Sequence, residues 1–238
     1  MSRLGNSRRR SLAYRFGAVV FVVFLAAGFV VWGPLVRAED VRITGGEPDA
    51  QLEAIASSLR GKPMLLLSEE RIAEDVAAIP WVAKAEVSRN VLSRRVEIRV
   101  SRRIPAAWAS IGGSVLLLDV EGAAFAVTPS ASPGLLEVTG EIEPLALGSR
   151  SKRVAALVEA ASALSRWSKE SFISASWSDR SGVTLRLVSG SQVRVGTATD
   201  LEAKGRALRA MQEKASAEGI RVRTYSVVAP AAPALEPA

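Results

Sequence analysis

The two residues of this 238-residue chain that most resemble a catalytic pair are Ser149 and Lys152, which follow the S-x-x-K spacing of penicillin-recognising enzymes. On a helix, this spacing places the lysine amine one turn from the serine hydroxyl, where it can accept the serine proton. The companion S-D-N and K-T-G motifs are missing from the chain. We therefore favour a solvated helix start at this point, with a Ser/Lys cell-wall hydrolase as a minor alternative.

Other patterns that could support chemistry are weaker. Residues 61–63 (Gly-Lys-Pro) lack the earlier glycine and the Ser/Thr of a phosphate-binding loop. Four carboxylates fall in the first two turns of an expected helix, where acidic side chains favour the positive helix end: Glu69, Glu70, Glu74 and Asp75. The chain has no histidine and no cysteine, which excludes thiolate nucleophiles, histidine bases and zinc sites of the Cys/His kind. We expect no catalytic residue, no metal and no cofactor.

Positive charge is concentrated at the start of the chain. The formal net charge is +7, a balance that could indicate nucleic-acid binding. Residues 1–36, however, contain five arginines and no lysine or acidic residue, and four of these arginines directly precede an apolar segment: Arg8, Arg9, Arg10 and Arg15. Without these five, 26 basic residues face 24 acidic ones. The body is nearly neutral, so we expect no nucleic-acid partner and no small-molecule substrate.

The apolar segment begins at Phe16 and ends at Val36, and its 21 residues carry no charge. A helix of this length spans roughly 31 Å, which matches a hydrocarbon core of about 30 Å. The arginines predict a cytoplasmic head over residues 1–15 and an extracytoplasmic body. A cleaved signal peptide is the alternative, but its apolar region is usually 7–15 residues long. We expect an uncleaved, single transmembrane helix.

After the apolar segment, residues 37–105 predict a small α+β domain. Apolar residues at helical spacing indicate a first helix, with Leu52, Ile55, Ala56 and Leu59 on one face, and a second helix follows up to Pro80. Alternating patterns indicate strands over 41–44, 82–89 and 95–103. The expected order is strand, helix, helix, strand, strand, with the helices covering one face of the sheet.

Residues 106–228 predict a second domain, rich in strands and with two helices. One helix has apolar residues at Val154, Leu157, Val158, Ala161 and Leu164, and the other at Leu201, Leu208, Met211 and Ala215. Residues 220–228 are the last expected strand, in a mixed and mostly antiparallel sheet. The Pro/Ala-rich tail, residues 229–238, is expected to be disordered.

Several segments, taken in this order, resemble the FtsQ/DivIB family of bacterial cell-division proteins. They are VRITGG (41–46), IPWVAKAEVSR (79–89), VEIRVSRRIPAAWA (96–109), LLDVEGAAF (117–125), LLEVTG (135–140) and DLEAKGRAL (200–208). The resemblance implies a cytoplasmic head, one membrane span, a POTRA domain and a β-domain. It also implies a non-enzymatic scaffold in the plasma membrane at the division septum, with divisome partners of the FtsB/FtsL type.

The chain departs from the family pattern in two places. It has Leu92-Ser93 where an aromatic residue and a proline are usual, and Arg102-Arg103 where Glu-Arg is common. These departures put a family contact of the POTRA domain in doubt without affecting the expected fold. The pairs Arg94-Arg95 and Arg102-Arg103 could bind anionic lipid, although solvated strand ends are the favoured interpretation.

The predicted partner-binding site is the final strand, because a free sheet edge offers unpaired backbone groups to a partner strand. Its residues are Ile220, Val222, Thr224, Tyr225 and Val227. The resemblance implies that FtsB/FtsL-type partners add a strand in this part of the β-domain. A paired strand within the core is the alternative for the strand itself. A POTRA-containing envelope transport or assembly component is the alternative for the function.

Overall fold

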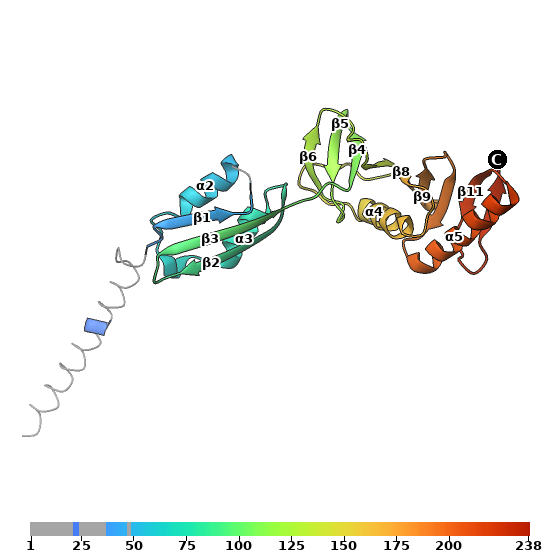
Figure 1. Ribbon diagram of the computed structural model, residues 1–238. Coiled ribbons are helices and arrows are strands. Elements are labelled where there is room, and N and C mark those ends of the chain that lie inside the picture. The colour runs from blue at the N-terminus through green and yellow to red at the C-terminus, as the bar shows by residue number, and fades with distance from the viewer. Residues whose placement is uncertain (1–20, 24–36, 47–48) are drawn as a thin grey trace, which may run out of the picture. The chain divides into compact units, whose positions relative to one another are not determined.

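The computed structural model describes residues 21–23, 37–46 and 49–238. Contacts divide the chain into two compact units, Met1–Arg102 and Arg103–Ala238, which are described separately (Figure 1). We refer to them as the N-terminal unit and the C-terminal unit.

The predicted membrane segment lies almost wholly outside the described residues, as do the arginines that predict its topology. Residues 21–23 are its described part, and they are helical. Among the described residues, no helix combines the length and the apolar character needed to cross a membrane.

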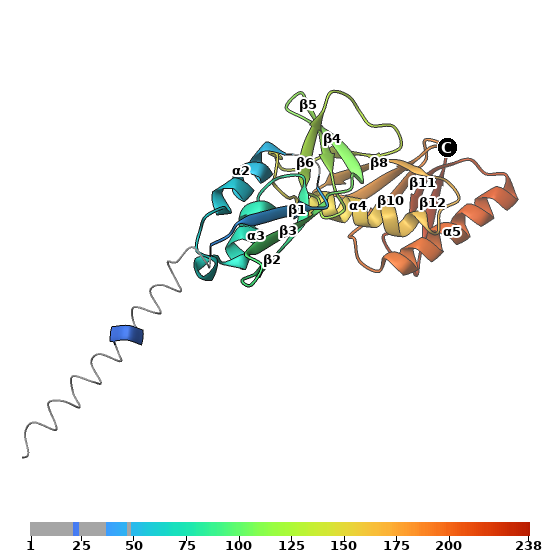
Figure 2. The same ribbon diagram turned by 60° about the vertical axis from the view of Figure 1, so that its left-hand side comes forward.

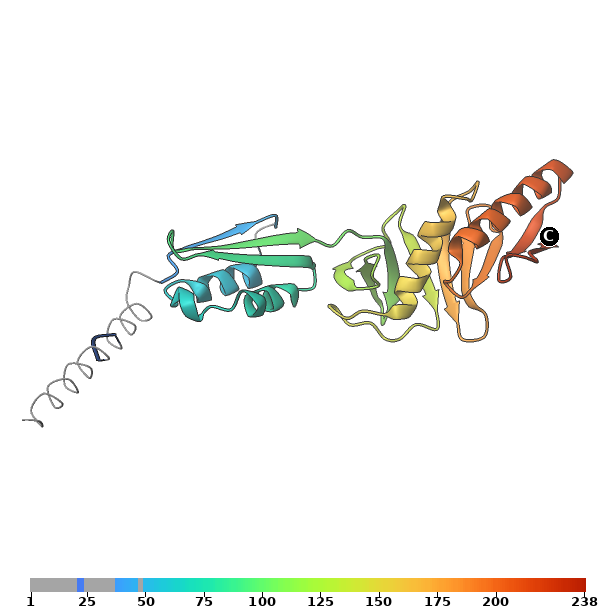
Figure 3. The ribbon, with the colours of Figure 1, turned by 90° about the horizontal axis from the view of Figure 1, so that it is seen from below.

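The N-terminal unit is a three-stranded sheet with two helices on one face (Figure 3). Its elements are β1 (Asp40–Thr44), α2 (Ala50–Leu59), the short 3-10 helix η2 (Met64–Leu66), α3 (Glu69–Ala77), β2 (Val82–Asn90) and β3 (Arg95–Arg102). The middle strand is β3, which is parallel to β1 and antiparallel to β2. The predicted order of strand, helix, helix, strand, strand is confirmed.

The core of the N-terminal unit lies between its helices and the sheet. Residues one helical turn apart are buried on α2 and α3, and they face alternate residues of β3: Leu52, Ala56, Leu59, Ile72, Val76, Val96, Ile98 and Val100. Asp49 caps α2 by accepting from two backbone N–H groups, and Ser68 caps α3. The helical spacing read from the sequence therefore positions this layer correctly.

The C-terminal unit is built on a nine-stranded mixed sheet. Its strands are β4 (Ala107–Ile111), β5 (Ser114–Leu118), β6 (Ala124–Thr128), β7 (Leu136–Gly140), β8 (Phe172–Ser178), β9 (Gly182–Leu187), β10 (Gln192–Gly196), β11 (Val222–Ser226) and β12 (Ala234–Pro237). They lie in the order β12-β11-β10-β9-β8-β7-β4-β5-β6. Parallel pairing is confined to β10–β11, β7–β8 and β4–β7. The predicted mixed, mostly antiparallel sheet is confirmed.

Two helices complete the C-terminal unit, as the sequence predicts. These are α4 (Lys152–Ser165) and α5 (Leu201–Glu218), which lie side by side and pack against the sheet (Figure 2). The predicted apolar face of α4 is buried in one continuous core with β4, β5 and β7–β11. On α5 the buried face also includes Lys204, Gly205 and Gln212.

The tail is where the structure departs from the sequence prediction. Residues 229–238 were expected to be disordered because of their Pro/Ala composition, but β12 forms within them and pairs antiparallel with β11. Leu235 lies opposite Tyr225 and packs against the core of the unit. The strand is seated by its backbone register with β11 and by this apolar contact, and composition alone does not reveal either.

Candidate partner-binding edge

The S-x-x-K residues do not form a catalytic pair. Ser149 precedes α4, and its hydroxyl donates to the Ala146 carbonyl (2.7 Å) and accepts from the Ala146 N–H (3.0 Å). The helix begins only at Lys152, with Ser151 as its N-cap. Because Ser149 and Lys152 do not share a helical turn, the geometry required for proton transfer to the lysine is absent from this site. The structure therefore gives no support to the Ser/Lys hydrolase alternative.

The first basic pair is engaged within the N-terminal unit. Arg94 forms an ion pair with Glu39, and Arg95 forms one with Asp40 (2.8 Å). Asp40 also accepts from Arg42 (3.0 Å), and the neighbouring Arg95 guanidinium holds the pKa of the Asp40 carboxyl below its usual value. These pairs lie at the sheet surface, and they support the interpretation of solvated strand ends.

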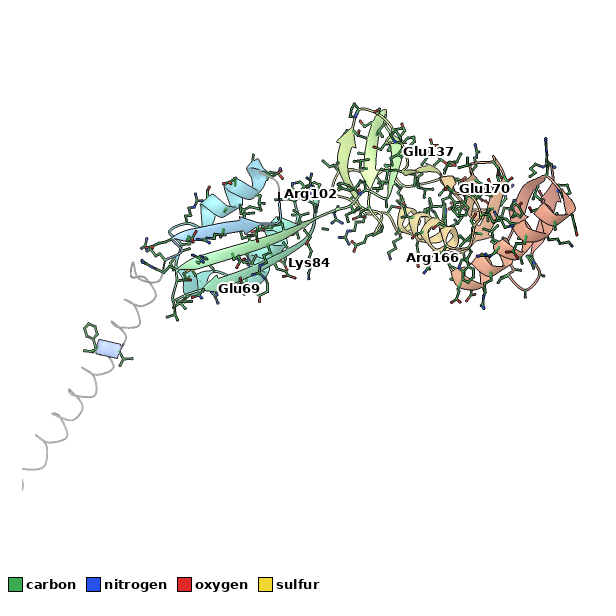
Figure 4. All side chains as sticks on the ribbon, in the orientation of Figure 1. Glu69, Lys84, Arg102, Glu137, Arg166 and Glu170 are labelled. Carbon is green, nitrogen blue, oxygen red and sulfur yellow. The ribbon has the colours of Figure 1, made fainter. Side chains whose placement is uncertain are left out.

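The second basic pair separates into two environments. Arg102 lies at the end of β3 (Figure 4). Its guanidinium lies over the Trp81 ring, 5.7 Å from the ring centroid. Trp81 in turn donates its indole N–H to Asp49 (3.0 Å). Arg103 instead forms a buried ion pair with Asp119 in the C-terminal unit. Both arginines thus have partners within their own units.

The predicted partner-binding residues lie on and beside β11, but β11 is not the edge of the sheet. It lies between β10 and β12. Val222, Thr224, Tyr225 and Val227 are buried, and Ile220 is half-buried against the same core. Burial also raises the pKa of the Tyr225 hydroxyl. The expectation that this strand forms a free edge is wrong, because β12 covers it.

Few interactions hold β12 in place. Leu235 supplies the apolar contact, and Glu236 forms an ion pair with Arg194 across β11 (3.4 Å), in which both side chains are about half exposed. The Ala238 N–H donates to the Arg221 carbonyl (2.9 Å). An exposed ion pair of this kind contributes about 0–1 kcal/mol to stability. The strand is therefore short and mostly exposed, and apart from its backbone pairing with β11 it has few side-chain contacts.

The outer side of β12 is poor in hydrogen-bond donors. The Ala238 N–H points toward β11, and residues alternate in direction along an antiparallel ladder. This alternation turns the backbone nitrogens of residues 233, 235 and 237 outward. Two of these residues are prolines, Pro233 and Pro237, which have no N–H to donate. Leu235 is the one donor among these three positions, so a further strand outside β12 would find few partners.

The opposite edge of the sheet is partly covered. The Ala124 N–H at the start of β6 donates to the Ser149 carbonyl (2.9 Å), and the Gly148 N–H donates to the Ala124 carbonyl (2.7 Å). The loop before α4 thus occupies the first position of the β6 edge. For a partner strand to pair along the whole of β6, the loop before α4 would have to be displaced. At the other edge, a partner strand could pair with β11 once the four residues of β12 are released.

Comparison with known proteins identifies the family. A model described as "POTRA domain, FtsQ-type" matches residues 37–103, and one described as "Cell division protein FtsQ/DivIB, C-terminal" matches residues 106–227. With its strand order and these two matches, the chain belongs to the FtsQ/DivIB family of cell-division proteins. Proteins of this family are non-enzymatic components of the divisome.

Curated relatives with the name "Cell division protein FtsQ" agree with this assignment. The protein of Chloroflexus aurantiacus is 30% identical over 138 residues, which cover 56% of this chain and 50% of that protein. The protein of Mycolicibacterium smegmatis is 28% identical over 52% of this chain and 38% of its own length. The protein of Koribacter versatilis is 30% identical over 50% of this chain and 31% of its own length. The chain thus spans about a third to a half of the length of these relatives.

Proposed function

We propose that this protein is a scaffold of the division machinery that holds partners of the FtsB/FtsL type at the septum by strand pairing in the C-terminal unit. The partner strand pairs with β11 and takes the place of β12. This assigns the partner contact to the backbone of Val222–Ser226, the strand that the sequence also favours. Family membership supports the role in division, and the strand exchange is the specific step that we add.

The observation that carries this proposal is the construction of β12. Strand addition draws its affinity from main-chain hydrogen bonds, and prolines at two outward positions remove donors from the outer side of β12. The inner strand, β11, has no proline, and it pairs with β12 in continuous register from Thr224 to Ser226 before the register shifts between Val222 and Thr224. Exchange therefore provides a better ladder for the partner than addition does.

Removal of the tail distinguishes exchange from addition. We expect a variant truncated after Val228 to capture co-expressed FtsB/FtsL-type partners more strongly than the intact chain does, because the truncation removes the competing strand. If the partner adds outside β12, the same truncation abolishes capture. Circular dichroism of both proteins checks that the C-terminal unit stays folded.

A disulfide provides a reversible test of the same step. Ser226 and Ala234 lie directly opposite each other on β11 and β12, and the chain has no cysteine of its own. Opposite residues of an antiparallel pair lie within disulfide range. We expect S226C/A234C to lose partner capture when oxidised and to regain it on reduction. The S226C single variant, which cannot lock β12, serves as the matched control. Unchanged capture by the oxidised double variant contradicts exchange.

We also propose that residues 16–36 form the single membrane span, with the arginine-rich head in the cytoplasm and residues from 37 onward outside. The length of the uncharged segment and the preceding arginines support this topology. Protease added to intact spheroplasts should degrade the body and leave a small protected N-terminal fragment. Complete protection of the body, or release of a shortened soluble chain, would contradict a type II anchor.

A further inference from the structure

In the described part of the N-terminal unit from residue 37 onward, the exposed large apolar side chains all lie in two short turns. Leu65 and Leu66 in η2 are 45% and 62% exposed, and Val91 and Leu92 in the β2–β3 turn are 37% and 98% exposed. We call these four residues the apolar end. Exposed apolar groups that gather in this way mark a surface that contacts a protein or a membrane.

The η2 side of the apolar end lies beside the residues that directly follow the uncharged segment 16–36. Arg37 forms an isolated β-bridge with Pro63, the residue that directly precedes η2. The Ala38 N–H donates to the Lys62 carbonyl (3.0 Å). The first two residues after the segment are therefore hydrogen-bonded neighbours of the loop that carries Leu65 and Leu66.

The β2–β3 turn lies on the other side of the same entry point. The Glu39 N–H donates to the Arg94 carbonyl (3.0 Å), and the two side chains form an ion pair. In the parallel pairing of β1 with β3, Asp40 lies opposite Arg95. The start of β1 and the β2–β3 turn thus occupy one end of the sheet (Figure 3). Two apolar turns flank the point at which the chain enters the unit.

The exposed leucines of η2 are held in ordered positions. The Arg89 guanidinium, on β2, donates to the carbonyls of Met64 and Leu67 (2.6 Å for Leu67) and pairs with Glu69 at the start of α3 (3.2 Å), labelled in Figure 4. Met64 and Leu67 are buried. Both flanking residues are thus anchored, and Leu65 and Leu66 lie on the surface between them.

Basic side chains border the apolar end. Arg60 and Lys62 are exposed, and neither forms an ion pair within the described residues. Apolar residues next to free cations are the composition of surfaces that lie at a lipid interface, where the apolar groups enter the acyl boundary and the cations meet phosphates.

We infer that the apolar end docks on the outer surface of the membrane, with Leu65, Leu66, Val91 and Leu92 in the headgroup–acyl boundary and with Arg60 and Lys62 at the headgroups of anionic lipids. The inference rests on the proposed membrane span, because that span places the bilayer next to residue 37. Docking would limit the tilt of the N-terminal unit relative to the membrane.

Site-specific fluorescence quenching tests this docking in the full chain. Because the chain has no cysteine, the variants V23C, L66C, L92C and V188C can each carry one environment-sensitive dye. The labelled proteins are reconstituted in vesicles of phosphatidylethanolamine and phosphatidylglycerol. We expect a lipid-borne nitroxide to quench dyes at 23, 66 and 92 several-fold more than the dye at 188. Val188 is an exposed residue of the C-terminal unit and serves as the aqueous control.

The outcomes separate docking from the membrane span on which it rests. Quenching at 23 without quenching at 66 and 92 overturns docking and leaves the span intact. The absence of lipid quenching at 23 overturns the span, and docking with it. Dyes at 66 and 92 that are shielded from both lipid-borne and aqueous quenchers indicate a covering protein or a second copy, which also overturns docking.

The basic residues can be tested separately. We expect R60Q/K62Q to reduce lipid quenching at position 92 in vesicles with phosphatidylglycerol and to leave it unchanged in pure phosphatidylcholine. Equal quenching of the variant and the parent protein in both vesicle types would remove Arg60 and Lys62 from the docking surface.

Discussion

Arg103 and Asp119 form an ion pair whose side chains are 7% and 6% exposed, and it joins the first residue of the C-terminal unit to the turn between β5 and β6. The other carboxylate oxygen of Asp119 accepts from the backbone N–H groups of Glu121 (2.9 Å) and Ala123 (2.8 Å). One buried aspartate therefore shapes the turn and fixes the start of the unit. This accounts for the LLDVEGAAF segment as a structural element.

Removal of one partner of this pair should be costly. We expect R103M to lower the free energy of unfolding by about 3–5 kcal/mol, because it leaves a buried carboxylate without its counter-ion. D119N keeps an acceptor for the turn, and the double variant R103M/D119N should lose less than the two single variants combined. Chemical denaturation followed by tryptophan fluorescence measures each value.

An exposed pair in the same unit provides the control for this measurement. Arg150 and Glu121 are 3.0 Å apart, and both side chains are more than half exposed. R150Q should change stability by about 0–1 kcal/mol. A loss in R150Q as large as that in R103M would mean that burial of the Arg103–Asp119 pair is not what makes it important.

The features predicted correctly from the sequence are those encoded locally. The spacing of Leu52, Ala56 and Leu59 defines the buried face of α2, and the spacing of Val154, Leu157 and Val158 defines that of α4. These signals depend on residues only three or four positions apart. The order of elements then follows, because each helix and strand is recognised independently of the others.

The features that were missed depend on distant pairing. The seating of β12 requires Leu235 to meet Tyr225, ten residues earlier in a separate strand, and a Pro/Ala tail gives no local sign of it. The exposure of Leu65 and Leu66 likewise goes with contacts from another element, because Arg89 on β2 donates to the carbonyls of Met64 and Leu67 on either side of them. Lys204 could have been found, because it lies at helical spacing between Leu201 and Leu208 on the buried face of α5.

Gly205 permits close contact between α5 and the Trp167 ring. A Cβ at this position would lie 2.2 Å from Trp167 Cδ1. Alanine normally stabilises a helix by about 1 kcal/mol relative to glycine. We nevertheless expect G205A to destabilise the unit by roughly 1–3 kcal/mol, because the ring must move from a packed position. Thermal unfolding measures the change.

The Trp167 variant shows whether the clash is the cause. In a W167A background the ring is absent, and G205A should become neutral or stabilising through its helix propensity. The same loss in both backgrounds would show that Gly205 is required for a reason other than its contact with Trp167.

Lys204 should make stability dependent on alkaline pH. Its amine donates to the carbonyls of Val195 (2.9 Å) and Thr197 (2.7 Å), and burial lowers its pKa, with the Asp200 charge acting in the opposite direction. Between the folded pKa and the ordinary lysine value, the unfolded state binds more protons than the folded state does. The free energy of unfolding contributed by this group therefore rises with pH through this range.

A comparison with K204M isolates this effect. We expect K204M to be less stable than the parent protein by about 1–3 kcal/mol, because the carbonyls of the buried Val195 and of Thr197 lose their donor. The gap should widen as the pH rises from neutral toward the ordinary lysine pKa. K214M, which changes an exposed lysine of the same helix, should show no such trend. A gap that stays constant with pH would contradict a lowered pKa at Lys204.

Asp49 links the N-terminus of α2 to the start of β2, so its variants should separate capping from the contact with Trp81. Its carboxylate accepts from the Leu52 (3.1 Å) and Gln51 (2.9 Å) N–H groups and from the Trp81 indole N–H (3.0 Å). We expect D49A to lower stability by about 1 kcal/mol or more through loss of the cap, whereas D49N should retain most of the stability at neutral pH.

The acid dependence of stability distinguishes these two variants further. The Leu52 N–H bond, with smaller effects from Trp81 and Gln51, lowers the pKa of Asp49 in the folded state. The stabilisation is therefore present above the unfolded pKa and is lost as the pH falls through the folded pKa. The parent protein should approach D49N in stability as the solution is acidified, because the amide does not titrate. A difference between the two proteins that stays constant through the acid range would show that the charge of Asp49 does not contribute to capping.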